Sequence, residues 1–406
     1  MIREMNIEDL SLHIKNPFTP GAGCKPPELA GREEDVKTFK TLVARTGLQR
    51  VDRGIIFSGL RGVGKTALLV TLDEYASDNS MLTARIESSG VIEDDYGRLF
   101  RAISLAVSEF DMHNTNLKSR ISEVISSVSS VSVSALGVSA KFESKKAEDQ
   151  ENDSLKLELL ITNLSRKLKE LKSGFFLFID ELQEMNSDLL GVLISIQHNL
   201  GQLSLPFYII GAGLPNLPGV LSKSRSYAER LFEYRGIDKL NEESTIKAFQ
   251  IPAESEGVTF DSKALKCLVE LSGGYPYFIQ SYGEAAWNES DSNPITLSSV
   301  TAGQVKARQK LDDGLYAARW QRASECARNY LIAMSKLGGD DPVPTSSLAE
   351  LIGKPSKELS VIRESLIKLG LIYSSKRGMV AFTVPGMGDF ITRTQPSSSQ
   401  PYDFGN

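Results

Sequence analysis

The sequence predicts a doubly wound α/β fold with a parallel sheet, followed by a helical region and a small domain of helices and strands. Three observations support this fold: short apolar runs alternate with helical patterns, the runs then stop, and a mixed pattern begins near the C-terminus. Strands are predicted at residues 55–58, 82–87, 175–180, 207–211 and 232–237. Because 406 residues exceed what one hydrophobic core usually fills, we expect two or three domains.

A complete phosphate-binding loop follows the first predicted strand. Residues 59–66 read GLRGVGKT, which matches G-x-x-x-x-G-K-[ST] before a helix predicted over residues 66–75. The glycines let backbone amides point at phosphate oxygens, and the start of the helix adds positive charge. In this motif the lysine neutralises the β- and γ-phosphates, and the threonine holds Mg²⁺. The predicted nucleotide-binding residues here are Gly59, Gly62, Val63, Gly64, Lys65, Thr66 and Ala67.

The third predicted strand ends in two carboxylates, Asp180 and Glu181. Beside a phosphate-binding loop, Asp180 would hold Mg²⁺ together with Thr66, and Glu181 would orient or deprotonate the attacking water. The alternative is an ordinary strand with a solvated acidic end, and the complete loop motif argues against it. The two motifs together predict hydrolysis of a nucleoside triphosphate, with Lys65 and Glu181 as catalytic residues.

The composition predicts a protein of the cytoplasm. Three cysteines lie far apart in the sequence, and together with only three histidines they form neither a disulfide framework nor a zinc-site spacing. No run approaches the roughly twenty apolar residues of a membrane span, and the first residues do not resemble a signal peptide. A net charge of −5 gives no overall attraction to nucleic acid, so contact with DNA requires a local basic patch.

About ninety residues separate the second and third predicted strands, more than one crossover helix needs, so we expect an insertion at about 115–150. Within it, residues 126–142 alternate small polar residues with apolar ones, a period of two that predicts a β-hairpin. A flexible serine-rich linker is the alternative. A bare valine edge would promote aggregation, so we expect a neighbouring subunit or partner to cover the hairpin.

Helical patterns replace the strands after residue 237. Helices are predicted at residues 241–250, 262–271, 275–288 and 298–313. We interpret residues 238–318 as a helical lid, an element that lies over a nucleotide and responds to the γ-phosphate. Gly273 and Gly274 end one of these helices, and Pro276 suits the first turn of the next, where a missing N–H group costs nothing.

Residues 319–394 predict a winged helix. Helices at 325–337, 345–352 and 356–369 precede two short strands around residues 375–378. The third helix would present cations to a DNA groove, and the turn between the strands would meet phosphate. The predicted DNA-binding residues are Lys357, Arg363, Lys368, Lys376 and Arg377. Glu358 and Glu364 share this helix, so a structural or protein-binding winged helix is the alternative. Residues 395–406 are predicted to be disordered.

The order of these features resembles that of bacterial AAA+-type P-loop ATPases of the origin-recognition and initiator clade, which grade into the STAND signalling ATPases. The leader agrees, because residues 16–21 and 27–33 resemble the segment that wraps the adenine in this family. The resemblance implies an adenine-pocket leader at 1–30, an ATPase core at 31–237, and ATP with Mg²⁺ as the bound groups. It also implies assembly into homo-oligomers.

The resemblance further suggests two site residues in the core. The strand that ends in a polar sensor residue in this family here runs into residues 211–216, so Asn216 is the candidate to reach the γ-phosphate, with a plain turn residue as the alternative. Arg230, and after it Arg225, lies on a predicted helix at 225–232, where an arginine finger would reach a neighbour's nucleotide. An ion pair of Arg230 with Glu229 or Glu233 is the alternative.

The lid departs from the initiator pattern, because residues 272–278 lack a second sensor arginine and resemble the G-x-P of STAND proteins instead. Pro276 would then touch the nucleotide by shape, although its structural role at a helix start is sufficient to explain it.

Two functions fit these observations. In the first, the protein binds and hydrolyses ATP and acts as an ATP-dependent oligomeric switch on duplex DNA through the winged helix. In the second, a STAND-like signalling ATPase gates a surface for a protein effector, without functional DNA binding. The basic patch favours the first function, the missing sensor arginine favours the second, and we favour the first. A small-molecule kinase has no support, because the sequence shows no acceptor site.

Overall fold

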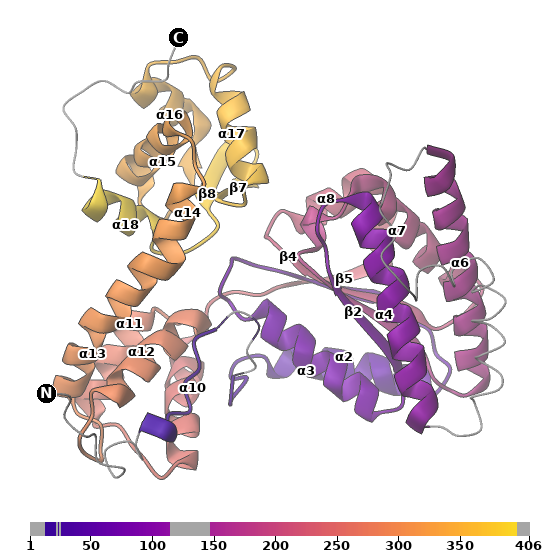
Figure 1. Cartoon of the computed structure of the whole chain (residues 1–406), viewed down its shortest axis with the longest axis horizontal. Helices are drawn as coiled ribbons and strands as arrows, with labels where there is room; N and C mark the ends of the chain where they lie inside the picture. Colours follow the sequence, from indigo (N-terminus) through magenta and orange to yellow (C-terminus); the bar gives the residue numbers. More distant parts are fainter. Residues whose placement is uncertain (1–12, 22, 24–25, 114–146, 396–406) are drawn as a thin grey trace, which may run out of the picture.

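The computed structural model describes residues 13–21, 23, 26–113 and 147–395 of the chain. The predicted hairpin at 126–142 and the predicted disordered tail from residue 396 onward lie outside the described residues. The described residues form a parallel-sheet core, a helical region and a small C-terminal domain (Figure 1). The predicted α/β fold class is therefore confirmed.

The core is built on a five-stranded parallel sheet. Its strands are β1 (Gly54–Ser58), β2 (Leu82–Glu87), β3 (Phe175–Asp180), β4 (Phe207–Gly213) and β5 (Phe232–Gly236). They lie in the order β2-β3-β4-β1-β5, and every neighbouring pair is parallel. All five carboxyl ends therefore meet at one edge of the sheet, where the loop after β1 and the carboxylates after β3 are placed. Relative to the prediction, β4 continues two residues further and β5 ends one residue earlier.

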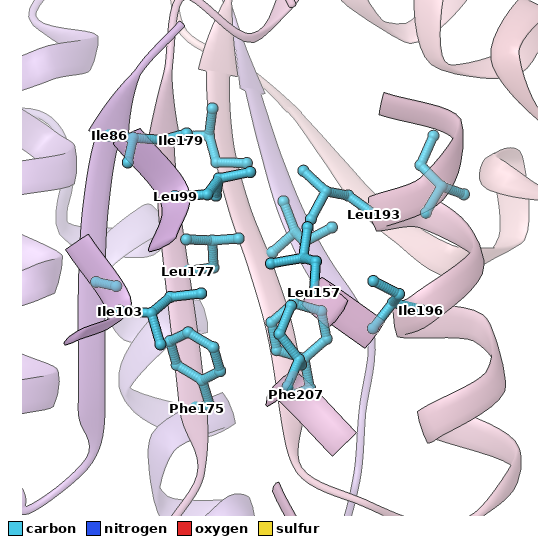
Figure 2. Packing of buried hydrophobic residues seen from close by; sticks show 14 of the residues in the cluster. Ile86, Leu99, Ile103, Leu157, Phe175, Leu177, Ile179, Leu193, Ile196 and Phe207 are labelled. Atoms are coloured by element: carbon cyan, nitrogen blue, oxygen red, sulfur yellow. The ribbon is translucent and has the colours of Figure 1, made fainter. Parts of the chain in front are cut away.

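Helices cover both faces of the sheet. They are α2 (Glu33–Gly47), α3 (Lys65–Asp78), α4 (Ile92–His113), α6 (Ala147–Glu170), the 3-10 turn η2 (Leu182–Glu184), α7 (Ser187–Gln202), α8 (Leu217–Ser224) and α9 (Ala228–Leu231). Phe175, Leu177 and Ile179 of β3 point to the face that α4, α6 and α7 cover (Figure 2). Phe176 and Phe178 point to the opposite face, against α2 and α3. A strand buried on both faces has side chains on alternate sides, which explains its continuous apolar sequence.

The predicted helix over residues 225–232 is wrong, because the structure divides this segment. Arg225 ends α8 with an extended backbone (φ −147°, ψ 122°), and α9 begins only at Ala228. The Arg225 guanidinium explains the break. Its Nε donates a hydrogen bond to Ser195 Oγ on α7 (3.2 Å), and it packs on Gly191 of the same helix. This tertiary contact holds the chain out of a continuous helix.

The helical region follows β5. Its helices are α10 (Glu242–Ser255), α11 (Ser262–Ser272), α12 (Pro276–Asn288) and α13 (Leu297–Lys310), and α13 continues through a π-helix, η3 (Leu311–Tyr316), into α14 (Ala317–Gln321). The leader is fastened to this region, because the Phe18 ring lies 6.1 Å from that of Phe249 and 6.4 Å from that of Trp287. Gly283 leaves the space for Phe18, since a Cβ there would lie 2.6 Å from the Phe18 ring.

The C-terminal domain combines helices with a three-stranded antiparallel sheet. Its elements are α15 (Glu325–Gly338), β6 (Val343–Pro344), α16 (Thr345–Ile352), α17 (Leu359–Lys368), β7 (Ile372–Lys376), β8 (Met379–Phe382) and α18 (Met387–Thr394). The strands form an antiparallel sheet in the order β6-β8-β7. Helix α17 begins at Leu359 and not at residue 356, because the preceding residues form a turn in which Glu358 N donates to Pro355 O (2.9 Å). Lys357 therefore lies in this turn.

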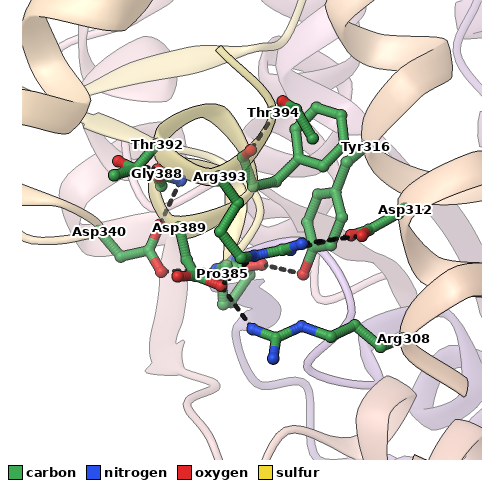
Figure 3. A network of polar contacts seen from close by, with 12 residues as sticks. Arg308, Asp312, Tyr316, Asp340, Pro385, Gly388, Asp389, Thr392, Arg393 and Thr394 are labelled. Atoms are coloured by element: carbon green, nitrogen blue, oxygen red, sulfur yellow. Dashed lines mark hydrogen bonds and ion pairs between the residues drawn. The ribbon is translucent and has the colours of Figure 1, made fainter. Parts of the chain in front are cut away.

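Polar contacts join the helical region to the C-terminal domain (Figure 3). The guanidinium of Arg393 on α18 donates to both carboxylate oxygens of Asp312 in the π-helix (2.9 and 3.0 Å). Arg308 of α13 donates to Asp389 (2.8 Å), and the Tyr316 hydroxyl donates to Pro385 O (2.8 Å). These contacts hold the C-terminal domain to the helix that leads into it.

Within the described part of the chain, no helix combines the length and the apolar composition that crossing a membrane requires.

Candidate functional site

A cavity of about 400 Å³ lies at the carboxyl edge of the sheet, where the core, the leader, the helical region and the C-terminal domain meet. Its lining includes Thr19, Pro20, Glu28 and Leu29 of the leader, Lys65, Thr66, Asp180 and Glu181 of the core, Pro276 and Tyr277 of α12, and Leu315, Arg319, Val384 and Pro385. The structure thus brings the predicted loop, the predicted carboxylates and the predicted leader into one cavity. Four separate parts of the chain build it.

The loop after β1 has the backbone that its glycines allow. Gly62 and Gly64 have φ values of +84° and +89°, a left-handed conformation that favours glycine. Gly59 has no room for a side chain, because a Cβ there would lie 2.0 Å from Ile237 O. Lys65 begins α3, and its Nζ donates to the carbonyl oxygens of Gly59 (3.0 Å) and Leu60 (2.8 Å).

Lys65 carries a perturbed ammonium group. Its side chain is buried at the base of the cavity, and this burial lowers the pKa of Lys65 to about 8. The nearby carboxylates of Glu181 and Asp180 act in the opposite direction, and the charge of Arg61 lowers the pKa further. A phosphate group at this position would stabilise the protonated form of Lys65 and would therefore raise its pKa.

Thr66 and Asp180 lie next to each other at the carboxyl edge of the sheet. Thr66 Oγ1 donates a hydrogen bond to Asp180 Oδ2 (2.6 Å), which places two oxygen ligands side by side. Among the described residues no cluster of three or more His, Cys, Asp or Glu side chains could hold a metal ion. Mg²⁺ typically takes one or two protein oxygens and completes its shell with substrate phosphates and water. The hydroxyl and carboxylate therefore fit Mg²⁺ bound together with a nucleotide.

Both carboxylate oxygens of Glu181 have partners. Oε1 accepts from Arg61 Nη1 (2.7 Å), and Oε2 accepts from Gln183 Nε2 (2.5 Å). Gln183 in turn accepts a hydrogen bond from Leu214 N (3.0 Å), which ties Glu181 to the end of β4. The Glu181 backbone is left-handed (φ 49°). Glu181 is therefore held in place, and its pairing with Arg61 makes the carboxylate a weaker base.

Three arginines contribute to the site although the sequence motifs assign them no role. Arg61 occupies a variable position of the loop, and its side chain holds Glu181. Arg32 Nη2 donates to Val63 O (3.1 Å) and to Asp238 O, which joins the leader to the loop and to the segment after β5. Arg319 lines the cavity from α14. Only the fold brings such distant positions together, so their spacing along the chain carries no pattern.

The helical region and the C-terminal domain both contact the loop backbone. Tyr277 N donates to Gly62 O (3.2 Å), and a Cβ at Gly64 would lie 3.8 Å from Pro276. From the other side, Arg61 N donates to Thr383 O of the C-terminal domain (3.0 Å). The structure thus places Pro276 against the phosphate-binding loop, and it places the C-terminal domain there as well.

Asn216 does not line this cavity. It lies at the start of α8, beside a second hollow of about 520 Å³ between the core and the C-terminal domain. Asn216 lies away from the predicted position at the γ-phosphate because β4 continues to Gly213 and the next amide, Leu214 N, donates a hydrogen bond to Gln183. The chain turns toward the second hollow after this contact. Asn216 Oδ1 is buried and has no hydrogen-bond partner among the described residues.

Arg230 and Arg225 differ in their surroundings. Arg225 is anchored to α7 through Ser195, whereas Arg230 is exposed on α9 and is not part of the cavity lining. No described contact joins Arg230 to Glu229 or Glu233, and Glu233 pairs with Arg235 instead (3.2 Å). Within its own chain Arg230 therefore has no ion-pair partner in the described structure.

The five predicted DNA-binding residues fall into two groups. Arg363, Lys376 and Arg377 line the second hollow, opposite Pro215 and Gly219 of the core. The other two are exposed outside it, Lys357 in the turn before α17 and Lys368 at the end of this helix. The described contacts include no ion pair for any of the five side chains. Part of the basic surface thus faces the core.

Comparison with known proteins agrees with this architecture. Residues 28–210 match the family described as AAA ATPase domain, and residues 313–391 match a domain of unknown function. A search of curated protein sequences gave no match. A Walker-type ATPase of Pyrococcus abyssi is similar in structure, with a TM-score of 0.55 at 14% identity over 89% of this chain and 96% of its own.

Two further solved structures align with lower scores. The Orc1 protein of Aeropyrum pernix in complex with DNA gives a TM-score of 0.48 at 16% identity, over 94% of this chain and 96% of its own. The RuvB Holliday junction branch migration motor of Thermotoga maritima gives 0.46 at 17% identity, over 89% and 96%. The family match and the sheet order show that the core has the fold of an AAA+ P-loop ATPase.

Proposed function

Starting from the AAA+ fold of the core, we propose that this protein binds and hydrolyses ATP and acts as an ATP-dependent oligomeric switch on duplex DNA, through a C-terminal winged helix. The observation that carries this proposal is the cavity, because one wall holds the phosphate-binding loop with Asp180 and Glu181, and another belongs to the C-terminal domain. A nucleotide bound there would touch both the catalytic groups and the domain that we assign to DNA.

The loop residues would bind the phosphates of ATP. Lys65 would exchange its contacts with the carbonyls of Gly59 and Leu60 for phosphate oxygens, and the amides of the loop would add hydrogen bonds. Thr66 and Asp180 would hold Mg²⁺, which neutralises charge on the β- and γ-phosphates when it is bound. The leader residues at the other end of the cavity would surround the adenine.

Glu181 would orient the attacking water and accept its proton. A positioned general base of this kind contributes about 10²–10⁴-fold to a rate. In the structure its carboxylate is bound by Arg61 and Gln183, so release from Arg61 would make it a stronger base. The phosphates of ATP offer Arg61 another anion, and we infer that they compete with Glu181 for it.

The C-terminal domain would respond to the nucleotide through its contacts with the loop. Arg61 N bonds to Thr383 O, and Val384 and Pro385 line the cavity. A ligand shifts a conformational equilibrium only if it binds the two conformations with different affinity. Through these contacts, ATP and ADP would favour different positions of the C-terminal domain. The position of this domain would in turn decide how far DNA reaches Arg363, Lys376 and Arg377, which face the core in the structure.

Arg230 would act between subunits. Its exposure on α9, without an ion-pair partner among the described contacts, leaves its guanidinium available to a neighbouring molecule. A guanidinium supplied by the next subunit stabilises charge in phosphoryl transfer and makes hydrolysis depend on assembly. We therefore propose that ATP hydrolysis requires a homo-oligomer.

A STAND-like switch that gates a protein effector is the second candidate. Two observations favour it: Pro276 lies against the phosphate-binding loop, and three of the five proposed DNA contacts line a hollow whose other side is the core. In that case the C-terminal domain would serve a protein partner.

ATP hydrolysis by the purified protein, with and without random-sequence duplex DNA, distinguishes the two candidates. The assay is run at two salt concentrations and over a range of protein concentrations. We expect specific activity to rise with protein concentration and with DNA, and the effect of DNA to fade with salt because phosphate contacts release counterions. Turnover that is indifferent to DNA would favour the STAND-like switch, and absence of turnover under all conditions would contradict both.

A further inference from the structure

Arg319 is a cation in the wall of the nucleotide cavity for which the ATPase motifs give no role. It lies on α14, the short helix between the helical region and the C-terminal domain. Its Nη1 donates to Leu315 O (2.9 Å), and the described contacts include no carboxylate partner for it. The guanidinium is partly exposed, so it remains accessible from the cavity.

The surroundings of Arg319 are those of an anion site. Burial lowers its pKa, and the positive charges of Arg61 and Arg322 lower it further. A partly buried guanidinium without a carboxylate is unfavourable on its own, and an anionic ligand would compensate it. Arg61 is already paired with Glu181, whereas the described contacts give Arg319 no carboxylate partner.

The position of Arg319 indicates which end of a bound nucleotide it would contact. Arg319 lines the same cavity as Lys65 and Glu181, and Glu181 is the side chain proposed to hold the attacking water beside the γ-phosphate. The leader, proposed to surround the adenine, lines the same cavity from a different segment. The start of α12, where the sequence lacks a sensor arginine, places the neutral Tyr277 at the loop.

We propose that Arg319 binds the γ-phosphate of ATP in its own chain, and that the C-terminal domain thereby takes different positions with ATP and with ADP. This inference rests on the proposed ATP site and adds a residue that its sequence motifs do not contain. Arg319 would supply from α14 the charge that the lid does not supply from the start of α12.

Helix α14, which carries Arg319, packs against the C-terminal domain. Movement of Arg319 toward a phosphate would therefore be transmitted to this domain. Three residues before Arg319, the Tyr316 hydroxyl donates to Pro385 O, and the Tyr316 ring stacks on Phe390 with 5.3 Å between centroids (Figure 3). On the other side of Arg319, the Arg328 guanidinium lies over the Trp320 ring (5.4 Å), and its Nε donates to Trp320 O (3.1 Å). A phosphate that draws Arg319 therefore moves the whole domain.

The test compares Arg319→Ala and Arg319→Lys with the wild type and with Arg322→Ala. The control removes the same charge from an exposed position three residues further on, outside the cavity lining. Calorimetry measures the affinity of each protein for ADP and for an ATP analogue with a nitrogen bridge between the β- and γ-phosphates. We expect Arg319→Ala to weaken the analogue by about 10–100-fold, the range of a charge-assisted hydrogen bond, and ADP by less than about twofold.

Arg319→Lys should recover part of the loss. Arg322→Ala should weaken both nucleotides slightly and to the same extent, because the exposed charge of Arg322 is screened by solvent and salt. Limited proteolysis of the segment between α13 and α15 adds a readout of domain position: wild-type cleavage should differ between the analogue and ADP, and that difference should vanish in Arg319→Ala. Equal weakening of both nucleotides, or no weakening, would overturn the inference while leaving the ATPase proposal intact. A wild-type protein that binds neither nucleotide would contradict the ATPase proposal itself.

Discussion

The proposed nucleotide cavity and the basic hollow both lie between the core and the C-terminal domain, and the cations of the phosphate-binding loop differ from those of the hollow. In the cavity, Lys65 donates to two carbonyls and Arg61 pairs with Glu181. In the hollow, the described contacts give Arg363, Lys376 and Arg377 no ion pair. The cations of the phosphate-binding loop therefore have partners before a ligand arrives, whereas Arg319 of the same cavity and the three cations of the hollow have no ion pair among the described contacts.

This difference shows how the two sites depend on the fold. The cavity is assembled from strand ends and a loop whose geometry the core sheet fixes, so its residues hold one another in place. The hollow exists only because the C-terminal domain lies where the contacts around Arg393 and Thr383 place it. A change in domain position would leave Lys65, Thr66, Asp180 and Glu181 of the core in place and would alter the hollow.

The largest expected effect comes from Lys65→Ala, which removes the buried cation of the cavity. We expect ATP affinity to fall by on the order of 100-fold or more, with loss of turnover, because the lysine supplies charge-assisted bonds to phosphate. Affinity for DNA in the absence of nucleotide should not change. Calorimetry checks the first result, and Lys37→Ala, an exposed lysine paired with Glu34, is the matched control. Retained ATP affinity in a folded Lys65→Ala protein would refute the nucleotide site.

Arg230→Ala should reduce turnover by on the order of 10³-fold without changing ATP affinity, because an arginine finger acts on the transition state of phosphoryl transfer. Mixing this variant with Glu181→Gln should restore activity, since each partner provides what the other lacks. Arg225→Ala is the control, because Arg225 binds Ser195 in its own chain and should show no such rescue. If the mixture stays inactive, Arg230 does not act between subunits.

Replacing Arg363, Lys376 and Arg377 together by alanine should affect only the hollow. We expect weaker DNA binding, and the slope of log affinity against log salt should shrink by about 2.7, at about 0.9 for each lost phosphate contact. ATP affinity should remain that of the wild type. A triple variant of Lys239, Lys263 and Lys266, which are exposed and do not line the hollow, removes the same charge and should keep the slope. An unchanged slope in the first variant would show that DNA does not use the hollow.

The smallest expected effect is a pH dependence of nucleotide affinity. Burial lowers the pKa of Lys65 to about 8 in the free protein, and bound phosphates favour its protonated form, so the pKa rises on binding. Affinity should therefore be nearly constant below pH 8 and should fall by up to about tenfold per pH unit above it. Titrations with ADP up to pH 9.5, with thermal unfolding recorded at each pH, measure the effect. Constant affinity over this range would contradict the role given to Lys65.

Local sequence predicted the parts of the molecule that depend on local rules. The strand positions followed from apolar runs, and the positive φ values at Gly62 and Gly64 agree with the loop motif. To predict the contact between Thr66 and Asp180, one also has to infer the parallel sheet, which brings the carboxyl ends of β1 and β3 to the same edge.

The remainder depends on contacts between distant segments. Arg61 holds Glu181 across 120 positions of sequence, and Arg319 reaches the cavity from the helix that precedes the C-terminal domain. Asn216 was predicted at the γ-phosphate, but Gln183 fixes the end of β4 and the chain turns toward the hollow. None of these arrangements leaves a periodic pattern, so the sequence alone did not indicate them.

The central claim, an ATP-dependent switch on DNA, is tested most directly by the DNA affinity of Glu181→Gln in saturating ATP and in saturating ADP. This variant should bind ATP without hydrolysing it, so each state can be held during a titration with duplex DNA. If ATP promotes assembly, as proposed, several C-terminal domains would engage one duplex, so we expect tighter binding with ATP, by about 5–150-fold. Equal DNA affinity in the two nucleotide states would contradict the account.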